Sequence, residues 1–148
     1  MTLIVDAAPL VALGDRNDPR HASVRAVLES EPGDLVIPAP VTAEADYLLR
    51  RRGGRGAARA FLRDLASAVF LVETLTVEEH GLALELDQRH PRLDAGLADL
   101  SIVILAHRLG TRRLLTFDER DFRKPSGRCR AAPSIFCRPT AESGAQMR

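Results

Sequence analysis

Four acidic residues lie beside apolar segments of this sequence. Asp6 and Asp118 each directly follow a short apolar run, and Glu44 and Asp99 lie near the start of two helical patterns. Moving a carboxylate out of water is costly unless a partner or a cation compensates its charge. Four acids at the borders of core-forming segments therefore suggest a shared chemical role.

Carboxylates held close together favour a hard divalent cation. They repel one another and raise each other's pKa, and a cation relieves that repulsion. Mg²⁺ or Mn²⁺ takes oxygen ligands, keeps several waters and bridges readily to phosphate. Such a site can activate a water and stabilise charge on a phosphodiester in the transition state. The predicted chemistry is metal-assisted phosphodiester hydrolysis, with Mg²⁺ (or Mn²⁺) as cofactor.

The segments around the acids alternate between strand and helix patterns. Strands are predicted at 2–5, 35–37, 70–72 and 114–117, and helices at 7–14, 22–29, 41–51, 55–69, 76–89 and 96–109. Residues 134–136 can form one more short strand. This alternation predicts an α/β fold, a three-layer α/β/α sandwich with a mainly parallel sheet of four to five strands. We expect a single domain over 1–138 and a flexible tail over 139–148.

The predicted sheet brings some of the acids to one edge. Ligands bind such sheets outside the carboxyl ends of the strands, where the strand order reverses. Asp6 and Asp118 follow strands directly and project there, and Glu44 begins the helix that follows the second strand. Asp99 follows another helix, so the pattern alone does not place it at that edge.

Each acid also has an ordinary structural explanation. Asp6 can cap the helix that starts at Ala7, and Asp118 can cap a turn, because Asp is a favoured N-cap residue. Glu44 and Asp99 can be first-turn acids that the helix dipole favours. Taken one at a time these explanations compete with the metal site, but together they require four unrelated coincidences.

The overall composition is that of one soluble globular domain. The chain has 148 residues and a net charge of +1, so no strong overall field attracts nucleic acid. Its two cysteines are too few for a disulfide scaffold or a cysteine-based zinc site. The N-terminus lacks a basic signal-peptide region, and no apolar run approaches the roughly 18 residues of a membrane span. We therefore expect a cytoplasmic protein with no membrane contact.

Four motifs, in their order along the chain, carry a family resemblance. VDAAPL, TAEADYLL, GLADLSIVILAHRLG and LLTFDERDF together resemble a PIN domain, in particular the VapC-type toxins of toxin–antitoxin modules. The resemblance covers about residues 3 to 122. It implies an α/β/α sandwich and a Mg²⁺- or Mn²⁺-dependent endoribonuclease, a nuclease of the hydrolase class. The family's catalytic acids fall on Asp6, Glu44, Asp99 and Asp118, of which Asp6, Asp99 and Asp118 are the implied metal ligands.

The resemblance also implies supporting residues and shows one departure. Asp94 has a counterpart in some members, and Thr116 matches a small hydroxyl residue that can orient a water or a carboxylate. Many relatives carry Ser or Thr after the first acid, whereas this chain has Ala7 and Ala8. A hydroxyl that can support the metal shell or a phosphate is therefore missing.

Arginines crowd the segment between residues 50 and 63. Arg52, Arg55, Arg59 and Arg63 are the predicted RNA-binding residues, through salt-sensitive contacts with the backbone. The alternatives are a solvated helix face or a contact with an antitoxin. Because Tyr47 is the only tyrosine and tryptophan is absent, no aromatic platform for bases is apparent. Substrate choice is then expected to depend on shape and backbone contacts.

The same family resemblance implies partners, and other functions are compared with it. The resemblance implies an RNA substrate, a cognate antitoxin protein and a homodimer. A catalytically degenerate PIN module that binds RNA or protein without cleaving is the main alternative. A phosphoacceptor hydrolase needs a second acid at position 8, which is Ala8, and a receiver domain needs a lysine at the end of a late strand, whereas Lys124 follows a polar segment.

Overall fold

Four parallel strands form the centre of the protein in the computed structural model, which describes residues 1–92 and 94–117. They are β1 (Thr2–Val5), β2 (Asp34–Pro38), β3 (Leu71–Glu73) and β4 (Leu114–Leu115), in the order β3-β2-β1-β4. Every neighbouring pair is parallel. The predicted parallel sheet is thus confirmed for four strands. The suggested strand at 134–136 and the predicted domain boundary at 138 lie outside the described residues.

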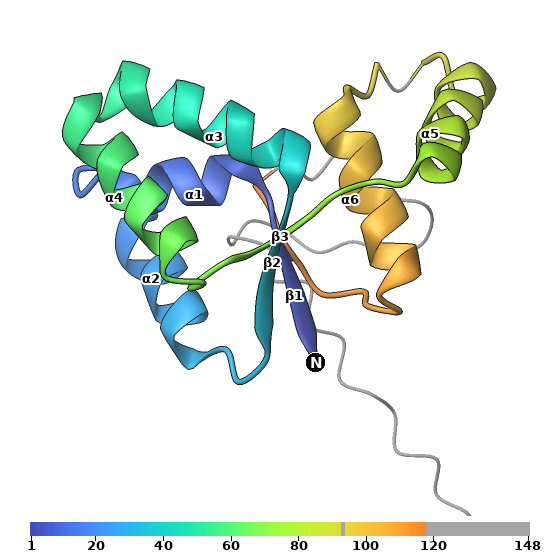
Figure 1. The fold of residues 1–148 in the computed structure, drawn as a ribbon. Coiled ribbons are helices and arrows are strands. Elements are labelled where there is room, and N and C mark those ends of the chain that lie inside the picture. The colour runs from blue at the N-terminus through green and yellow to red at the C-terminus, as the bar shows by residue number, and fades with distance from the viewer. Residues whose placement is uncertain (93, 118–148) are drawn as a thin grey trace, which may run out of the picture.

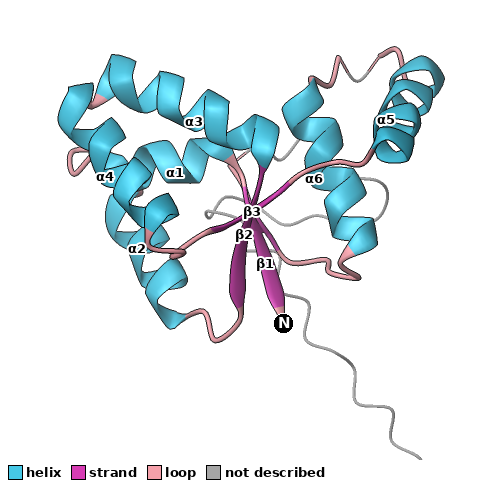
Figure 2. Cartoon of the chain, in the orientation of Figure 1, coloured by secondary structure: helices cyan, strands magenta, loops and turns pink. Residues whose placement is uncertain are grey.

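Helices cover the sheet on two sides. They are α1 (Ala7–Gly14), α2 (His21–Ser30), α3 (Ala39–Arg52), α4 (Gly54–Ala66), α5 (Val77–Arg89) and α6 (Leu97–Arg108). Figure 1 shows α1 to α4 on one side of the strands and α5 with α6 on the other, and Figure 2 separates helices from strands by colour. The predicted α/β/α sandwich is confirmed. In the described part of the chain, no helix is long and apolar enough to span a membrane.

Burial follows the position of each element in the sandwich. Leu3, Ile4 and Val5 of β1 are fully buried because this strand is paired on both edges and covered by helices on both faces. The helix α6 is only partly buried. Ile102 and Leu105 lie in the core, but Leu97 is 49% exposed and Val103 is 42% exposed. The cause is that α6 packs on β2, α3 and α5, which leaves one of its faces to solvent.

The strand order reverses between β1 and β4. The chain passes from β1 to β2 to β3 in one direction, and β4 then pairs with the free edge of β1. In open α/β sheets, ligands bind at this kind of switch point, outside the carboxyl ends of the strands. Asp6 follows β1 directly and Thr116 follows β4 directly. The topology therefore brings two predicted site residues to the switch point.

An ion pair closes the opposite, amino-terminal edge of the sheet. Arg113, just before β4, donates to both carboxylate oxygens of Glu31 at 2.6 and 2.5 Å. The backbone N–H of Gly33 also donates to Glu31, at 3.1 Å. The Glu31 side chain is only 2% exposed. Arg113 thus ties the start of β4 to the segment between α2 and β2.

Candidate active site

Asp6 is held in one orientation at the switch point. Its Oδ1 accepts a hydrogen bond from the backbone N–H of Ala7 at 2.6 Å, and its Oδ2 accepts one from the Thr116 hydroxyl at 2.7 Å. Its own backbone N–H donates to the carbonyl of Leu115 at 3.0 Å. Asp6 is therefore the N-cap of α1, and its hydrogen bonds also connect the end of β1 to β4. Capping and a site role coexist, because each carboxylate oxygen keeps room for another contact.

Glu44 and Asp99 approach this edge from two different helices. The prediction that Glu44 is a first-turn acid is wrong, because α3 begins at Ala39 and its first turn contains no acid; Glu44 lies in the second turn. Asp99 lies in the first turn of α6, and these two helices contact each other. Partial burial of its carboxyl raises the pKa of Glu44, and the negative charges of Asp6 and Asp99 raise it further. Asp99 Oδ2 also accepts a hydrogen bond from the backbone N–H of Gly96 at 3.1 Å, so it anchors the start of α6 as well.

The raised pKa of Glu44 predicts how stability depends on pH. The pKa of the Glu44 carboxyl in the folded protein lies above its ordinary value of 4.5. Such a carboxyl lowers the free energy of unfolding as pH rises from the ordinary pKa through the folded pKa, because the folded state then holds a proton that the unfolded state has lost. In the presence of EDTA, Glu44→Gln is expected to raise the melting temperature at pH 7 and to leave it unchanged near pH 4. Thermal unfolding followed by circular dichroism at both pH values measures the difference.

A nearby acid provides the control for this prediction. Asp46 lies on another face of α3, where it pairs with Arg50 at 2.8 Å. Asp46→Asn removes the same charge without relieving the repulsion at Glu44, so it is expected to give no gain. If Glu44→Gln does not raise the melting temperature at pH 7, or if it raises the melting temperature equally at pH 4, the negative charge of Glu44 does not destabilise the folded protein.

The structure does not place the other two predicted acids, Asp94 and Asp118, in the site. Asp94 is exposed in the segment before α6, with a backbone φ of 46°, a left-handed conformation that Asp tolerates. Asp118 lies outside the described residues. Among residues 1–92 and 94–117, no group of three or more His, Cys, Asp or Glu side chains could hold a metal ion.

The donor set nevertheless fits a divalent cation in its chemistry. Carboxylate and hydroxyl oxygens of Asp6, Asp99 and Thr116 are hard ligands, of the kind that Mg²⁺ and Mn²⁺ prefer. The negative charges of Asp6 and Asp99 contribute to the raised pKa of Glu44, so three carboxylates act on one another at this edge. A cation at this edge would remove that repulsion, and the predicted ligand set would then be completed by Asp118.

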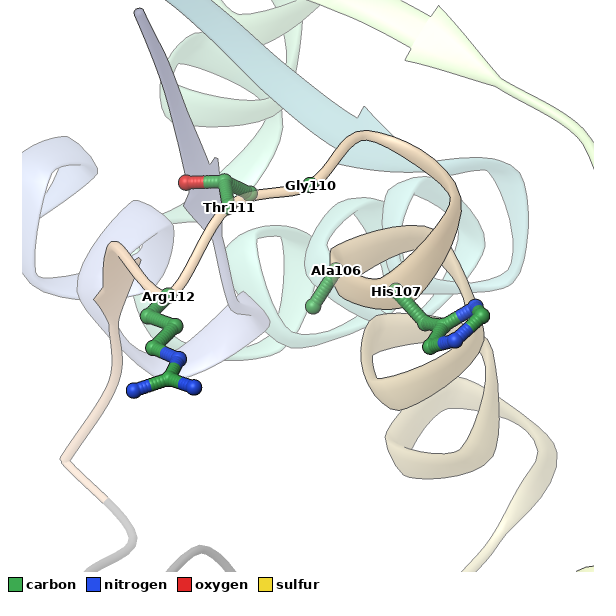
Figure 3. Close-up of a pocket in the computed structure, with 5 residues that line it drawn as sticks. All are labelled: Ala106, His107, Gly110, Thr111 and Arg112. Carbon is green, nitrogen blue, oxygen red and sulfur yellow. The ribbon is translucent and has the colours of Figure 1, made fainter.

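A pocket of about 300 Å³ lies at a different place in the fold. Figure 3 shows its lining residues, Ala106, His107, Gly110, Thr111 and Arg112, at the end of α6 and in the turn that leads to β4. The Thr111 hydroxyl donates to the carbonyl of Thr2, at the start of β1, at 2.7 Å. The pocket is therefore at the amino-terminal edge of the sheet, away from the acids, and none of its described lining residues carries a carboxylate.

The arginines on the α1–α4 side differ in their partners. The four arginines predicted to bind RNA are exposed at the end of α3 and along α4, and within the described part of the chain none of them forms an ion pair: Arg52, Arg55, Arg59 and Arg63. Arg20 is different. It pairs with Asp18 at 2.8 Å, which lowers the pKa of Asp18 to about 2, and it stacks on Phe117 at 4.0 Å.

The arrangement of these elements agrees with comparisons to known proteins. The family model of the PIN domain matches residues 3–127. The chain belongs to the PIN domain family. A relative of this PIN domain, Ribonuclease VapC26 from Mycobacterium tuberculosis, is 35% identical over 120 residues, which cover 81% of this chain and 89% of the relative. The resemblance to PIN-domain VapC toxins is thus confirmed.

Solved structures support the same placement. The Mycobacterium tuberculosis protein VapC20, described as a sarcin–ricin loop cleaving toxin, matches this PIN domain with a TM-score of 0.74 and 28% identity. The match covers 80% of this chain and 92% of VapC20. A toxin–antitoxin complex from Klebsiella pneumoniae matches with a TM-score of 0.59 and 18% identity, over 81% of this chain and 89% of that chain, which shows a shared fold.

Proposed function

We propose that this PIN domain is an RNA-cleaving toxin, an endoribonuclease that hydrolyses phosphodiester bonds with Mg²⁺ or Mn²⁺. The observation that carries the proposal is the fixed Asp6 carboxylate at the switch point, electrostatically coupled to Glu44 together with Asp99. The names of VapC26, a ribonuclease, and VapC20, a toxin that cleaves the sarcin–ricin loop, support RNA as the substrate class.

In this mechanism, Asp6, Asp99 and Asp118 are the residues that would hold the cation. When bound, the cation supplies Lewis-acid activation of water and neutralises charge on the phosphodiester. The Ala7 N–H and the Thr116 hydroxyl fix both oxygens of Asp6 before substrate arrives. Glu44 is the residue that would accept a proton from the attacking water, because partial burial, the main cause of its raised pKa, persists when a cation is bound and makes the carboxylate a stronger base.

A cleavage assay tests this function. The purified protein is incubated with single-stranded and structured RNA in Mn²⁺, in Mg²⁺ and in EDTA, and the products are separated on a denaturing gel. We expect endonucleolytic products in either metal and none in EDTA. Equal cleavage with and without metal would show that the proposed mechanism is wrong.

The exposed arginines are proposed to bind the RNA backbone. Replacing Arg55, Arg59 and Arg63 with Ala is expected to weaken RNA binding at low salt and to lower the slope of log K against log salt by about 2, since each contact to a single strand contributes about 0.7. Arg25, which pairs with Glu29 on α2, and Arg89, which pairs with Glu85 on α5, are the control positions: each replacement removes one exposed arginine, to be compared with the single changes at Arg55, Arg59 and Arg63. Unchanged affinity at low salt in the triple variant would refute this contact.

The degenerate module remains the second candidate function, because Ala7 and Ala8 replace the hydroxyl residues of many relatives. It predicts RNA or protein binding with no metal-dependent products in the same assay. For the active form we propose a cognate antitoxin as partner, a homodimer as the assembled state and the cytoplasm as the place of action. Co-expression with the neighbouring open reading frame, followed by size-exclusion chromatography, tests for the antitoxin complex. Size-exclusion chromatography of the protein alone tests for the homodimer.

A further inference from the structure

Tyr47 lies on the same face of α3 as Glu44. The two residues are three apart in one helix, which places their side chains side by side, one turn from each other. Arg51 follows four residues later, so Glu44, Tyr47 and Arg51 form a row that leads away from the acids over roughly 10 Å. An aromatic ring thus stands directly next to the candidate active site.

The ring is exposed and held in place. Tyr47 is 56% exposed, and its hydroxyl accepts a hydrogen bond from Arg51 Nη1 at 2.8 Å. The Arg51 guanidinium carbon is 5.7 Å from the ring centre, whereas that of Arg20 is 4.0 Å from the Phe117 ring, on which it stacks. Arg51 therefore holds the hydroxyl end of Tyr47 and leaves ring surface open to another planar group.

We propose that Tyr47 is a base-stacking residue for the RNA substrate, with Arg51 as its brace and as a cation for the adjoining phosphate. Resting on the proposed function, this inference adds how the substrate is positioned. Unpaired bases of RNA are recognised by stacking on aromatic side chains, and an arginine beside the ring adds charge for the backbone. The expectation that this chain lacks an aromatic platform is revised, because one exposed ring is enough to position one base.

The site would then favour cleavage next to nucleotides whose bases are not paired in an RNA duplex. A base that stacks on Tyr47 must be unpaired, so the site favours loops and single strands over duplex RNA. Since every base has a flat face, this contact selects RNA shape more than sequence. Cleavage next to an abasic position is expected to be slower than cleavage next to a normal base.

Tyr47 supplies its own reporter for the test. It is the only tyrosine, and the chain has no tryptophan, so tyrosine emission comes from this ring alone. Quenching is measured in EDTA with a short oligouridylate and with an oligonucleotide of the same length whose bases are missing. N-acetyltyrosinamide corrects for light absorbed by RNA. We expect quenching by the oligouridylate and little by the abasic oligomer, which carries the same phosphates.

Variants separate stacking from charge. Because Tyr47 variants have no tyrosine emission, their binding is measured with a fluorescently labelled oligouridylate. Tyr47→Ala is expected to raise its dissociation constant by about 5- to 150-fold, the range for loss of one base–aromatic stack, and Tyr47→Phe is expected to bind nearly as well as wild type. Leu84→Ala, at 57% exposure on α5, controls for loss of an exposed side chain. Arg51→Ala is expected to weaken binding, whereas Arg50→Ala, whose side chain pairs with Asp46, is not.

The outcomes for stacking and for catalysis can be told apart. If the wild type cleaves RNA with metal and Asp6→Asn does not, but the oligouridylate causes no quenching and Tyr47→Ala binds normally, the stacking proposal is overturned and the function stands. Equal quenching by the abasic oligomer overturns it as well. If metal-dependent cleavage is absent, the proposed function fails whatever the fluorescence shows.

Discussion

Asp6→Asn is expected to reduce metal-dependent RNA cleavage by at least about 100-fold. A metal ion contributes several kcal/mol of charge stabilisation to the transition state, and each 1.36 kcal/mol is about tenfold in rate. The Asn carbonyl oxygen can still accept a hydrogen bond from the Ala7 N–H, and the Asn amide can donate to the Thr116 hydroxyl oxygen, so the fold around it should persist. The change therefore removes one negative charge from the proposed metal site and little else. Initial cleavage rates at saturating Mn²⁺ measure the loss.

A second acid on the same helix makes the comparison specific. Asp15 follows the other end of α1, where its carboxylate accepts a hydrogen bond from the backbone N–H of Asn17 at 2.9 Å. Asp15→Asn is expected to keep wild-type cleavage. In Asp6→Asn, the pKa of Glu44 should also fall toward its ordinary value, because one of the charges that raise it is gone. Full cleavage activity in Asp6→Asn would exclude a metal ion bound by Asp6 as the source of catalysis.

The position of Asp6 could be predicted from sequence because a parallel strand ends at a defined edge. A continuous apolar run is typical of a central, doubly covered strand, and the residue after it must project at the carboxyl edge. The same rule applies to Glu44, which lies in the second turn of the helix after the second strand. Asp99 could not be placed in this way, since it follows a helix. Its electrostatic effect on Glu44 depends on how α3 and α6 pack, which is a tertiary property.

Other features depend on contacts between distant segments. The stacking of Arg20 on Phe117 joins the start of α2 to the residue after Thr116, and no local pattern in the sequence connects them. The exposure of Tyr47 was also not evident, because an aromatic residue within an apolar helical pattern is usually taken as core. Helix periodicity gave its angular position on α3 relative to Glu44, but only the packing of α3 on the sheet decides which face meets solvent.

The second large effect concerns stability, at the edge opposite the acids. Arg113→Met is expected to lower the free energy of unfolding by about 3 kcal/mol, because it leaves the carboxylate of Glu31 buried without its cation. Glu31 is 2% exposed and Arg113 21% exposed at the side chain, so water replaces little of the lost contact. Urea denaturation at pH 7 measures the loss. Arg25→Ala is the control, because its pair with Glu29 is 62% exposed on both sides and such pairs contribute little.

The pH dependence of the same variant identifies the cause of the loss. Arg113 lowers the pKa of Glu31 below its ordinary value of 4.5 through their hydrogen bonds. A carboxyl with a lowered folded pKa stabilises the protein above its unfolded pKa, and this contribution disappears as pH falls through the folded pKa. The gap between wild type and Arg113→Met should therefore be full at pH 7 and should narrow as pH falls below about 4.5. The double variant Glu31→Leu with Arg113→Met should recover part of the stability, because no buried charge then remains unpaired. A double variant as unstable as the sum of its single changes would show that the two residues act independently, and the ion pair would not be what holds this edge.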